Sequence, residues 1–348
     1  MTLPDTLPKR LCSEAEVDEL MARPNDALID MMRRIEGDIA ILGIAGKMGL
    51  SLGALAVNAI RAAGVTRNVY GISRFSDPAA LIALEQAGVI PVRCDLLDRA
   101  AVKGLPKVPN VIFMAGRKFG TAGEEDLTWA MNTLVPAQVC EHFTRSRIVA
   151  FSTGCVYPLI PLDRIGCVET DRPVPVGEYA QSCLGRERTF EYFSRINGTP
   201  VCVLRLNYAL DVRYGVIHDL ARTIWEGRPV DRTVGHFNAI WQGDANRQAL
   251  LALEQCSTPP TLLNLTGPET VSVTTLAETL GRLLDKTVTY AGEPGPTAYL
   301  NNAAMAHGLF GYPSVPLAHV IAWTAEWVKQ GGRSLGKPTH FEVADGKY

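Results

Sequence analysis

Three glycines spaced three residues apart stand in residues 39–49, IAILGIAGKMG. An apolar run precedes them and a long amphipathic segment follows, which places the glycines in a turn between a strand and a helix. Gly43 permits a tight turn, Gly46 lets the backbone approach a pyrophosphate, and Gly49 allows close helix–sheet packing. The phosphates are expected on the N–H groups around Lys47 and Met48, at the start of the helix. The pattern predicts a dinucleotide-binding turn, and the alternative is a purely structural one.

The second expected strand ends in Ser73 and Arg74, and Asp77 follows three residues later. An acidic residue at this strand end would bind the ribose hydroxyls of NAD, whereas a hydroxyl followed by a guanidinium suits the 2′-phosphate of NADP. Lys47 is expected to add a second positive charge. The sequence therefore favours NADP over NAD; the alternative is that Arg74 is solvated or stacks on the adenine.

The third and fourth expected strands end in residues that suit the rest of a dinucleotide. Asp95 is placed to accept the adenine amino hydrogen, with Leu96 against the ring, although an Asp here could equally cap the next helix. The small residues of Met114-Ala115-Gly116 would let the backbone pass beside the cofactor. These five residues are therefore predicted to bind it.

Two basic residues, Arg117 and Lys118, follow in the next loop. This loop is where an active site should lie, so Lys118 is predicted to contact an anionic substrate or a phosphate. The alternative is a solvated pair of charges, which is common on protein surfaces.

Short apolar runs alternate with amphipathic segments through the first 210 residues. The expected strands are residues 39–42, 69–72, 89–92, 111–114, 148–151 and 201–206, and two clear helical segments are residues 50–63 and 127–143. The runs are almost continuously apolar, as in strands covered on both faces. Their alternation with helices predicts an α/β fold with a doubly wound parallel sheet.

The domain organisation follows from where this alternation begins and ends. Residues 1–37 are predicted to form a helical extension packed on the main domain, and residues 38–208 a dinucleotide-binding domain whose sheet is re-entered around 236–268. Residues 209–235 and 269–330 are predicted to form a smaller mixed domain that closes over the ligand, and residues 331–348 a tail. After residue 210, the expected helices and strands are residues 216–226, 244–255, 262–265, 271–284, 287–290 and 320–328.

Charge and composition exclude several classes of protein. The 348 residues include 34 basic and 36 acidic side chains, so the basic excess of a nucleic-acid-binding surface is missing. Apolar runs stay well below the ~18 residues that span a bilayer, and the N-terminus lacks the apolar core of a secretory signal. The expected location is the cytoplasm. Eight cysteines without a CxxC pair and six histidines without ligand spacing predict no metal site.

Several separate segments resemble one family. They are the glycine turn, Asp95-Leu-Leu-Asp98, WAMN at 129–132, FSTGCVY at 151–157, YAQS at 179–182 and LNLTG at 263–267. In this order and spacing they resemble the extended short-chain dehydrogenase/reductases, the NAD-dependent epimerase/dehydratase group, over about residues 38–330. The resemblance implies a Rossmann fold and a nicotinamide dinucleotide, with Asn132 at the cofactor.

The same resemblance implies a catalytic set and one departure from it. In the family a Tyr moves the proton, a Ser or Thr binds the reacting oxygen, and a Lys four residues after the Tyr holds the ribose and lowers the Tyr pKa. Tyr179 and Thr153 match, but the Lys position is Cys183. A cation about 4 Å away is worth roughly 4 kcal/mol at an effective dielectric of about 20. Another cation is therefore needed, and the candidates are Lys118, Arg117 and Lys47.

The leading interpretation is an NAD(P)-dependent oxidoreductase or epimerase acting on a sugar or sugar-derived substrate, nucleotide sugars included. Tyr179, Thr153 and Cys183 form its atypical catalytic set, and Lys118, Tyr208 and Trp241 are predicted to contact the substrate, although Trp241 could equally be a core residue. Dehydration is disfavoured because the acidic residue expected beside the Ser/Thr is a glycine. The rival interpretation is a dinucleotide-binding pseudo-enzyme with a sensing or scaffold role. A homodimer is expected through residues 127–143 and 179–196.

Overall fold

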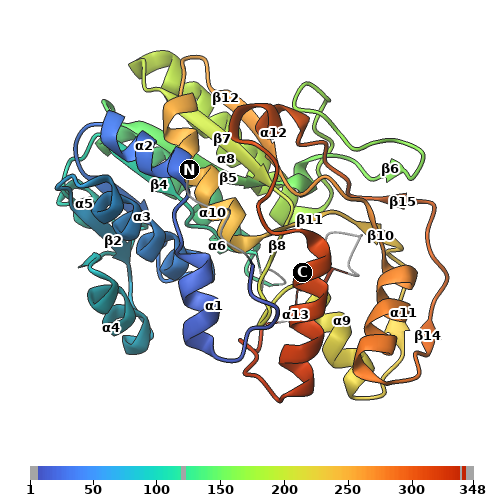
Figure 1. Ribbon diagram of the computed structural model, residues 1–348. Coiled ribbons are helices and arrows are strands. Elements are labelled where there is room, and N and C mark those ends of the chain that lie inside the picture. Colours follow the sequence, from blue (N-terminus) through green and yellow to red (C-terminus); the bar gives the residue numbers. More distant parts are fainter. Residues whose placement is uncertain (1–6, 119–122, 338, 342–348) are drawn as a thin grey trace.

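A seven-stranded parallel sheet forms the centre of the molecule, in a computed structural model that describes residues 7–118, 123–337 and 339–341 (Figure 1). The strand order is β12-β7-β5-β4-β1-β2-β3, with every neighbouring pair parallel. The strands are β1 (Ile39–Leu42), β2 (Val69–Ser73), β3 (Ile90–Arg93), β4 (Asn110–Phe113), β5 (Arg147–Thr153), β7 (Val201–Leu206) and β12 (Thr261–Leu265). The predicted α/β fold with a doubly wound parallel sheet is confirmed.

Successive side chains of each strand point to opposite faces of the sheet, and helices cover both faces of its central strands. In β1, Ile39 and Ile41 pack into one core cluster, and Ala40 and Leu42 into another. One face carries α2 (Asp26–Arg34), α3 (Gly49–Ala63), α4 (Pro78–Ala87) and α10 (Gln242–Leu251); the other carries α5 (Arg99–Lys103), α6 (Glu125–Trp129), α7 (Val135–His142) and α8 (Gly177–Asn197). This double covering explains the continuous apolar runs in the sequence.

The segment predicted as one helix over 127–143 contains a π-helical turn. Residues Ala130–Leu134 form it between α6 and α7, and it includes the buried Asn132. A π turn inserts one residue into the helical repeat and is often found at functional sites. Apolar spacing alone could not reveal this turn, because the flanking helices continue on either side of it.

The N-terminal extension consists of α1 (Glu14–Met21) and α2. Ser13 and Asn25 cap the two helices, each side chain accepting a backbone N–H. Their apolar faces are buried against α3 and α10. Of the predicted extension and tail, residues 1–6, 338 and 342–348 lie outside the described residues.

The smaller lobe packs three helices around its own core, near the carboxyl ends of the sheet strands (Figure 1). These helices are α9 (Val216–Trp225), α11 (Val273–Leu284) and α13 (Leu317–Lys329), with α12 (Ala304–Phe310) beside β12. Its short strands pair as β8 (Tyr208–Leu210) with β11 (Ala239–Trp241), β9 (Val230–Asp231) with β14 (Tyr290–Ala291), β10 (His236–Phe237) with β13 (Val271–Ser272), and β6 (Ile160–Pro161) with β15 (Thr297–Ala298). Within the described part of the chain, none of the helices combines the length and apolar character needed to cross a membrane.

Candidate functional site

The glycine turn between β1 and α3 is shaped by steric limits at its glycines. Gly43 has a φ of +88°, and a Cβ there would lie 2.7 Å from the backbone of Ala115 at the end of β4. A Cβ on Gly49 would overlap the carbonyl of Ile44. Among the described residues no side chain caps α3, whose first turn contains no acidic residue. The helix start therefore offers N–H groups and a positive dipole end, which fits a pyrophosphate.

Gly43→Ala is expected to lower stability by about 1–3 kcal/mol, because alanine must adopt a left-handed conformation and meet Ala115. Dinucleotide affinity should also fall, since the turn cannot relax without moving α3. Gly64→Ala is the matched control: Gly64 also has a positive φ, but a Cβ there meets nothing within 4 Å. Urea denaturation and calorimetry measure both effects. Equal behaviour of the two variants would contradict this account of the turn.

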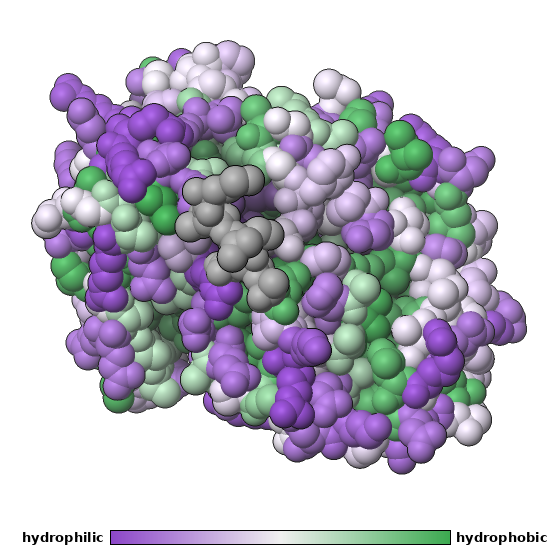
Figure 2. Space-filling view, viewed as in Figure 1, coloured by the Kyte–Doolittle hydropathy of each residue, from purple (hydrophilic) through white to green (hydrophobic). Residues whose placement is uncertain are grey.

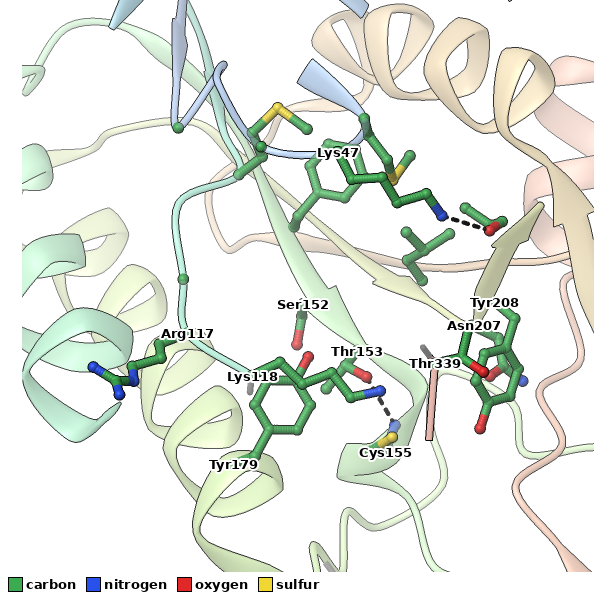
Figure 3. A pocket seen from close by; sticks show the side chains of 18 of the residues that line it. Lys47, Arg117, Lys118, Ser152, Thr153, Cys155, Tyr179, Asn207, Tyr208 and Thr339 are labelled. Carbon is green, nitrogen blue, oxygen red and sulfur yellow. Dashed lines mark hydrogen bonds between the residues drawn. The ribbon is translucent and has the colours of Figure 1, made fainter. Parts of the chain in front are cut away.

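A cavity of about 290 Å³ opens at the carboxyl ends of the central strands. It runs from Gly43 and Gly46 past Met48 and Met114 to Tyr179, so it joins the glycine turn to the predicted catalytic residues. The space-filling view in Figure 2 shows one face of the molecule, on which hydrophilic and hydrophobic residues are interspersed. Figure 3 shows the cavity, with α8 and the end of β5 on one side and β8 on the other.

Tyr179 and Thr153 meet in this cavity (Figure 3). Thr153 ends β5, and its Oγ1 accepts the Cys155 N–H at 3.2 Å, which fixes the hydroxyl. Burial raises the pKa of Tyr179 well above its usual value, and a hydrogen bond with Thr153 opposes that rise. The phenol therefore keeps its proton at neutral pH and is positioned, with the hydroxyl, to face a substrate oxygen.

Cys183 lies one turn after Tyr179 on α8, but it does not line the cavity. It is buried in a small apolar cluster with Val156 and Leu300. Burial raises the pKa of its thiol to about 11, so it remains protonated. The thiol interacts with Tyr179 from the core, and a catalytic role for Cys183 stays a prediction.

The three cations proposed to replace the missing Lys have different surroundings. Arg117 pairs with Glu124 and points away from the cavity (Figure 3). The Lys118 ammonium lies 5.8 Å from the centre of the Tyr179 ring and lines the cavity, and its contact with a substrate stays a prediction. Only Lys118 of these three therefore approaches the phenol.

Lys47 extends across the cavity from the glycine turn to the smaller lobe. Its ammonium donates to the Ala209 carbonyl at 3.0 Å and lies 3.3 Å from the centre of the Tyr214 ring. Burial lowers its pKa to about 7. The predicted pairing of Lys47 with Arg74 at a 2′-phosphate is therefore wrong; Lys47 links the two lobes instead.

Sequence reasoning missed a fourth cation, Arg186, which lines the same cavity. Its Nη1 donates to the Phe151 carbonyl at 2.8 Å, and its Nη2 donates to the Oδ1 of Asn132. The spacing of Tyr179, Cys183 and Arg186 is i, i+4, i+7, which puts all three on one face of α8. That spacing was visible in the sequence and could have indicated the residue.

Asn132 is held at the centre of a hydrogen-bond network beside the cavity. Its side-chain amide donates to Ser182 Oγ at 2.9 Å and to the Arg117 carbonyl at 3.2 Å, and its Oδ1 accepts the Arg117 N–H at 3.1 Å. Gly116 lines the cavity next to it, and a Cβ there would overlap the Arg186 guanidinium. The π turn thus supports the loop that follows β4.

The residues predicted for the adenine half lie at the ends of β2 and β3, outside the cavity. Ser73 is half-buried, Arg74 is exposed, and Arg93 donates to the Arg74 carbonyl at 2.8 Å. Asp95 is exposed, and its Oδ1 accepts the Leu97 N–H at 3.0 Å. The alternative role for Asp95, capping the next helix, is wrong because Asp98 caps α5. Leu96 is buried below them.

The smaller lobe brings Tyr208, Tyr214 and Thr339 to the cavity. Thr339 is held by the Asp219 carboxylate, which accepts its N–H at 2.8 Å and its hydroxyl at 2.6 Å. Asn207, to which the sequence assigned no role, also lines the cavity. The prediction of a substrate contact for Trp241 is wrong, because this side chain is 2% exposed.

Trp241 packs instead against Trp323, with ring centres 5.8 Å apart. Trp241 belongs to the core cluster of the smaller lobe, and the helix α10 that follows it is buried along its whole length. Core packing was the equally weighted alternative for this residue.

A buried ionic network supports the site from below. Glu187 accepts hydrogen bonds from Ser152 at 2.5 Å and from the Arg205 guanidinium at 3.1 and 2.8 Å. Arg205 also donates to the Tyr157 hydroxyl at 2.7 Å, which in turn donates to Asn264 at 2.9 Å. The network ties α8 to β5, β7 and β12, and so fixes where Tyr179 stands relative to Thr153.

Comparison with known proteins decides the family. The model of the NAD dependent epimerase/dehydratase family matches residues 39–232, more than half of the chain. The chain belongs to this family. The predicted resemblance is thereby confirmed, and it implies a nicotinamide dinucleotide as the cofactor. No curated protein matches the sequence.

Solved structures share the fold of this family member at low sequence identity. A UDP-glucose 4-epimerase from Thermotoga maritima, solved with UDP-glucose, has a TM-score of 0.70 at 18% identity over 84% of this chain and 99% of its own. A UDP-glucuronic acid 4-epimerase from Bacillus cereus, solved with NAD, has the same TM-score and coverage at 21% identity. An epimerase from Methanothermobacter thermautotrophicus has a TM-score of 0.70 at 19% identity, over 89% of this chain and 97% of its own.

Proposed function

We propose that the protein is an NAD(P)-dependent oxidoreductase or epimerase acting on a hydroxyl/carbonyl pair of a sugar or sugar-derived substrate. The observation that carries this proposal is the single cavity that joins the glycine turn to the Thr153–Tyr179 hydroxyl pair. Family membership supports the reaction class. Similar folds solved with UDP-glucose and UDP-glucuronic acid support a sugar substrate, nucleotide sugars included.

In this proposal the side chains move one proton and hold one oxygen. The Tyr179 phenol oxygen exchanges a proton with the substrate oxygen as the hydroxyl and carbonyl forms interconvert. Thr153 hydrogen-bonds the same oxygen, and its own position is fixed by the Cys155 N–H. When bound, the nicotinamide supplies the complementary hydride chemistry at the substrate carbon. Lys118, above the Tyr179 ring, is placed to contact an anionic group of the substrate.

Dehydration is not part of the proposal. A dehydratase needs an acidic side chain at the position of Gly154, but a Cβ there would lie 2.7 Å from the Asn301 amide. A carboxylate cannot fit in that space without displacing Asn301, which is itself buried. The proposed reactions are therefore epimerisation and simple oxidation or reduction.

The test is a panel of nucleotide sugars, free sugars and sugar acids with each oxidised and reduced dinucleotide. Nicotinamide absorbance detects net redox turnover, and proton NMR detects epimers formed without it. Turnover of any sugar supports the proposal. Tight dinucleotide binding with no turnover across the panel would instead support the second candidate, a dinucleotide-binding pseudo-enzyme, which the buried Cys183 and the raised Tyr179 pKa favour.

We further propose NADP as the preferred dinucleotide, on the basis of Ser73 and Arg74 at the end of β2. Arg93 supports this, since its guanidinium donates to the Arg74 carbonyl and adds a second positive charge. Arg74→Glu is expected to weaken NADP⁺ binding by about ten- to a hundredfold, the effect of one charge-assisted hydrogen bond. NAD⁺ binding should be unchanged or stronger. Calorimetry measures both, with the exposed Lys103→Met as control; equal losses for both dinucleotides would argue against a 2′-phosphate contact.

A homodimer is proposed through α6–α7 and α8. Leu134, Tyr192 and Ile196 on these helices are each at least half exposed, and Trp129 is partly exposed. Exposed apolar side chains gathered on neighbouring helices are typical of subunit contacts. Sedimentation of the purified protein at its monomer mass would contradict this proposal.

A further inference from the structure

The structure assigns Arg186 the charge that the missing lysine would have supplied: we propose that it is a positioning residue acting on Tyr179 and on the nicotinamide end of the dinucleotide. This inference rests on the cofactor and on the role of Tyr179 proposed above. It does not depend on which substrate the protein uses.

The first argument is the direction of the side chain. Arg186 lies two helical turns after Tyr179, and helical side chains lean toward the N-terminus of their helix. The guanidinium therefore extends back along α8 on the face that carries Cys183 and Tyr179. It lines the cavity, whereas Cys183 stays below it in the core. A long cationic side chain thus approaches from one turn further along the helix.

The second argument is that the guanidinium is rigidly held. The Phe151 carbonyl and the Asn132 Oδ1 accept hydrogen bonds from its two terminal nitrogens. The centre of the Phe113 ring lies 5.6 Å from the guanidinium carbon. Gly116 leaves the space that the guanidinium fills, because any Cβ there would overlap it. The third nitrogen, Nε, is buried and has no acceptor within the described residues. A fixed cation with one unused donor beside a ligand cavity is suited to a ligand hydroxyl as well as to charge compensation.

The third argument is electrostatic. Burial raises the pKa of both Tyr179 and Cys183, and the positive charge of Arg186 opposes the rise in each. Lys118 is the rival cation, 5.8 Å from the centre of the Tyr179 ring. It reaches over the ring from the loop after β4 (Figure 3), whereas Arg186 belongs to the same helix as the phenol and is fixed by two acceptors.

The test compares the affinities of the oxidised and reduced cofactor, because only the oxidised nicotinamide ring is positively charged. A nearby cation disfavours NADP⁺ relative to NADPH. Arg186→Gln removes the charge and leaves a shorter side chain with one amide nitrogen, so the ratio of NADP⁺ to NADPH affinity is expected to rise by about tenfold. Arg186→Lys should keep the ratio near that of the natural protein. Loss of a purely structural contact would weaken both affinities alike and leave the ratio unchanged.

The second arm of the test moves the positive charge from position 186 to position 183. Cys183→Lys in the Arg186→Gln background is expected to restore the ratio, and Cys183→Lys alone should lower it further. Arg188→Met is the matched control, since Arg188 lies on the same helix but is exposed and paired with Glu191. If Arg186→Gln does not fold, Lys118→Met still discriminates between the two cations, because a changed ratio in this variant would assign the charge to Lys118.

An unchanged ratio in Arg186→Gln, or a change in Lys118→Met alone, would overturn the inference. A changed ratio without turnover of any sugar in the natural protein would support the Arg186 charge at the nicotinamide end, but would reject the proposed enzyme function and with it the action of Arg186 on Tyr179. Calorimetry with NADP⁺ and NADPH provides the measurement, and turnover is followed separately.

Discussion

Tyr179→Phe is expected to lower turnover by about a hundredfold to ten-thousandfold, the usual contribution of a positioned acid–base group. The variant loses only the phenolic oxygen that faces Thr153 in the cavity. The ring remains against the apolar cluster that contains Cys183, so stability and dinucleotide affinity should change little. Steady-state rates and calorimetric affinities, measured on the same preparation, separate the two effects.

Tyr192→Phe is the control for this variant, because Tyr192 lies on the same helix and is half exposed. Its turnover should match that of the natural protein. Since burial raises the pKa of Tyr179, the phenol holds its proton through neutral pH. Carbonyl reduction should then vary little with pH in this range, and alcohol oxidation should accelerate as pH rises. Full turnover in Tyr179→Phe would place the proton transfer on another group.

The second large effect is on stability. Glu187→Gln is expected to lower the free energy of unfolding by about 3–5 kcal/mol, because it leaves Arg205 as a buried charge without its carboxylate. The two side chains are 0% and 2% exposed, and Arg205 makes two hydrogen bonds to the carboxylate. The loss should appear as a lower urea midpoint of unfolding.

Glu226→Gln is the matched control, since Glu226 pairs with Arg222 and Arg228 at the surface. Surface pairs contribute about 0–1 kcal/mol, so this variant should unfold near the natural midpoint. A second check is Glu187→Leu combined with Arg205→Met. Replacing both charges should cost less than removing one, because no unpaired charge remains. Equal losses in Glu187→Gln and Glu226→Gln would show that the buried network does not support the fold.

The strands of the sheet could be predicted closely from local sequence. The expected strand over 201–206 is observed as β7 with the same bounds, and the expected strand over 39–42 as β1. β1 is apolar throughout and β7 at every position except Arg205, because helices cover the two faces of the sheet. The glycine turn was equally predictable, because Gly43 needs a positive φ that few other residues tolerate.

The site was predicted less well where long side chains are involved. Lys47, Arg117 and Lys118 were all candidates for the missing charge, yet Lys47 ends on the Ala209 carbonyl and Arg117 on Glu124. Arg186 was overlooked, although its position seven residues after Tyr179 places it on the same face of α8. A flexible basic side chain takes the direction that its acceptors allow, and those acceptors come from distant parts of the chain.

The amino-acid sequence by itself determined the succession of the main strands and helices along the chain, the position of the phosphate-binding turn and the family. Each of these depends on short-range periodicity, on backbone dihedral limits or on a contiguous motif. Only the tertiary structure decided that Trp241 belongs to the core, that Cys183 is closed off from the cavity and that Arg186 opens onto it. These outcomes depend on which face of an element meets another element. That choice is made when the two lobes and the sheet pack together; the local spacing on α8 shows that Tyr179, Cys183 and Arg186 share a face, but not which of them reaches the cavity.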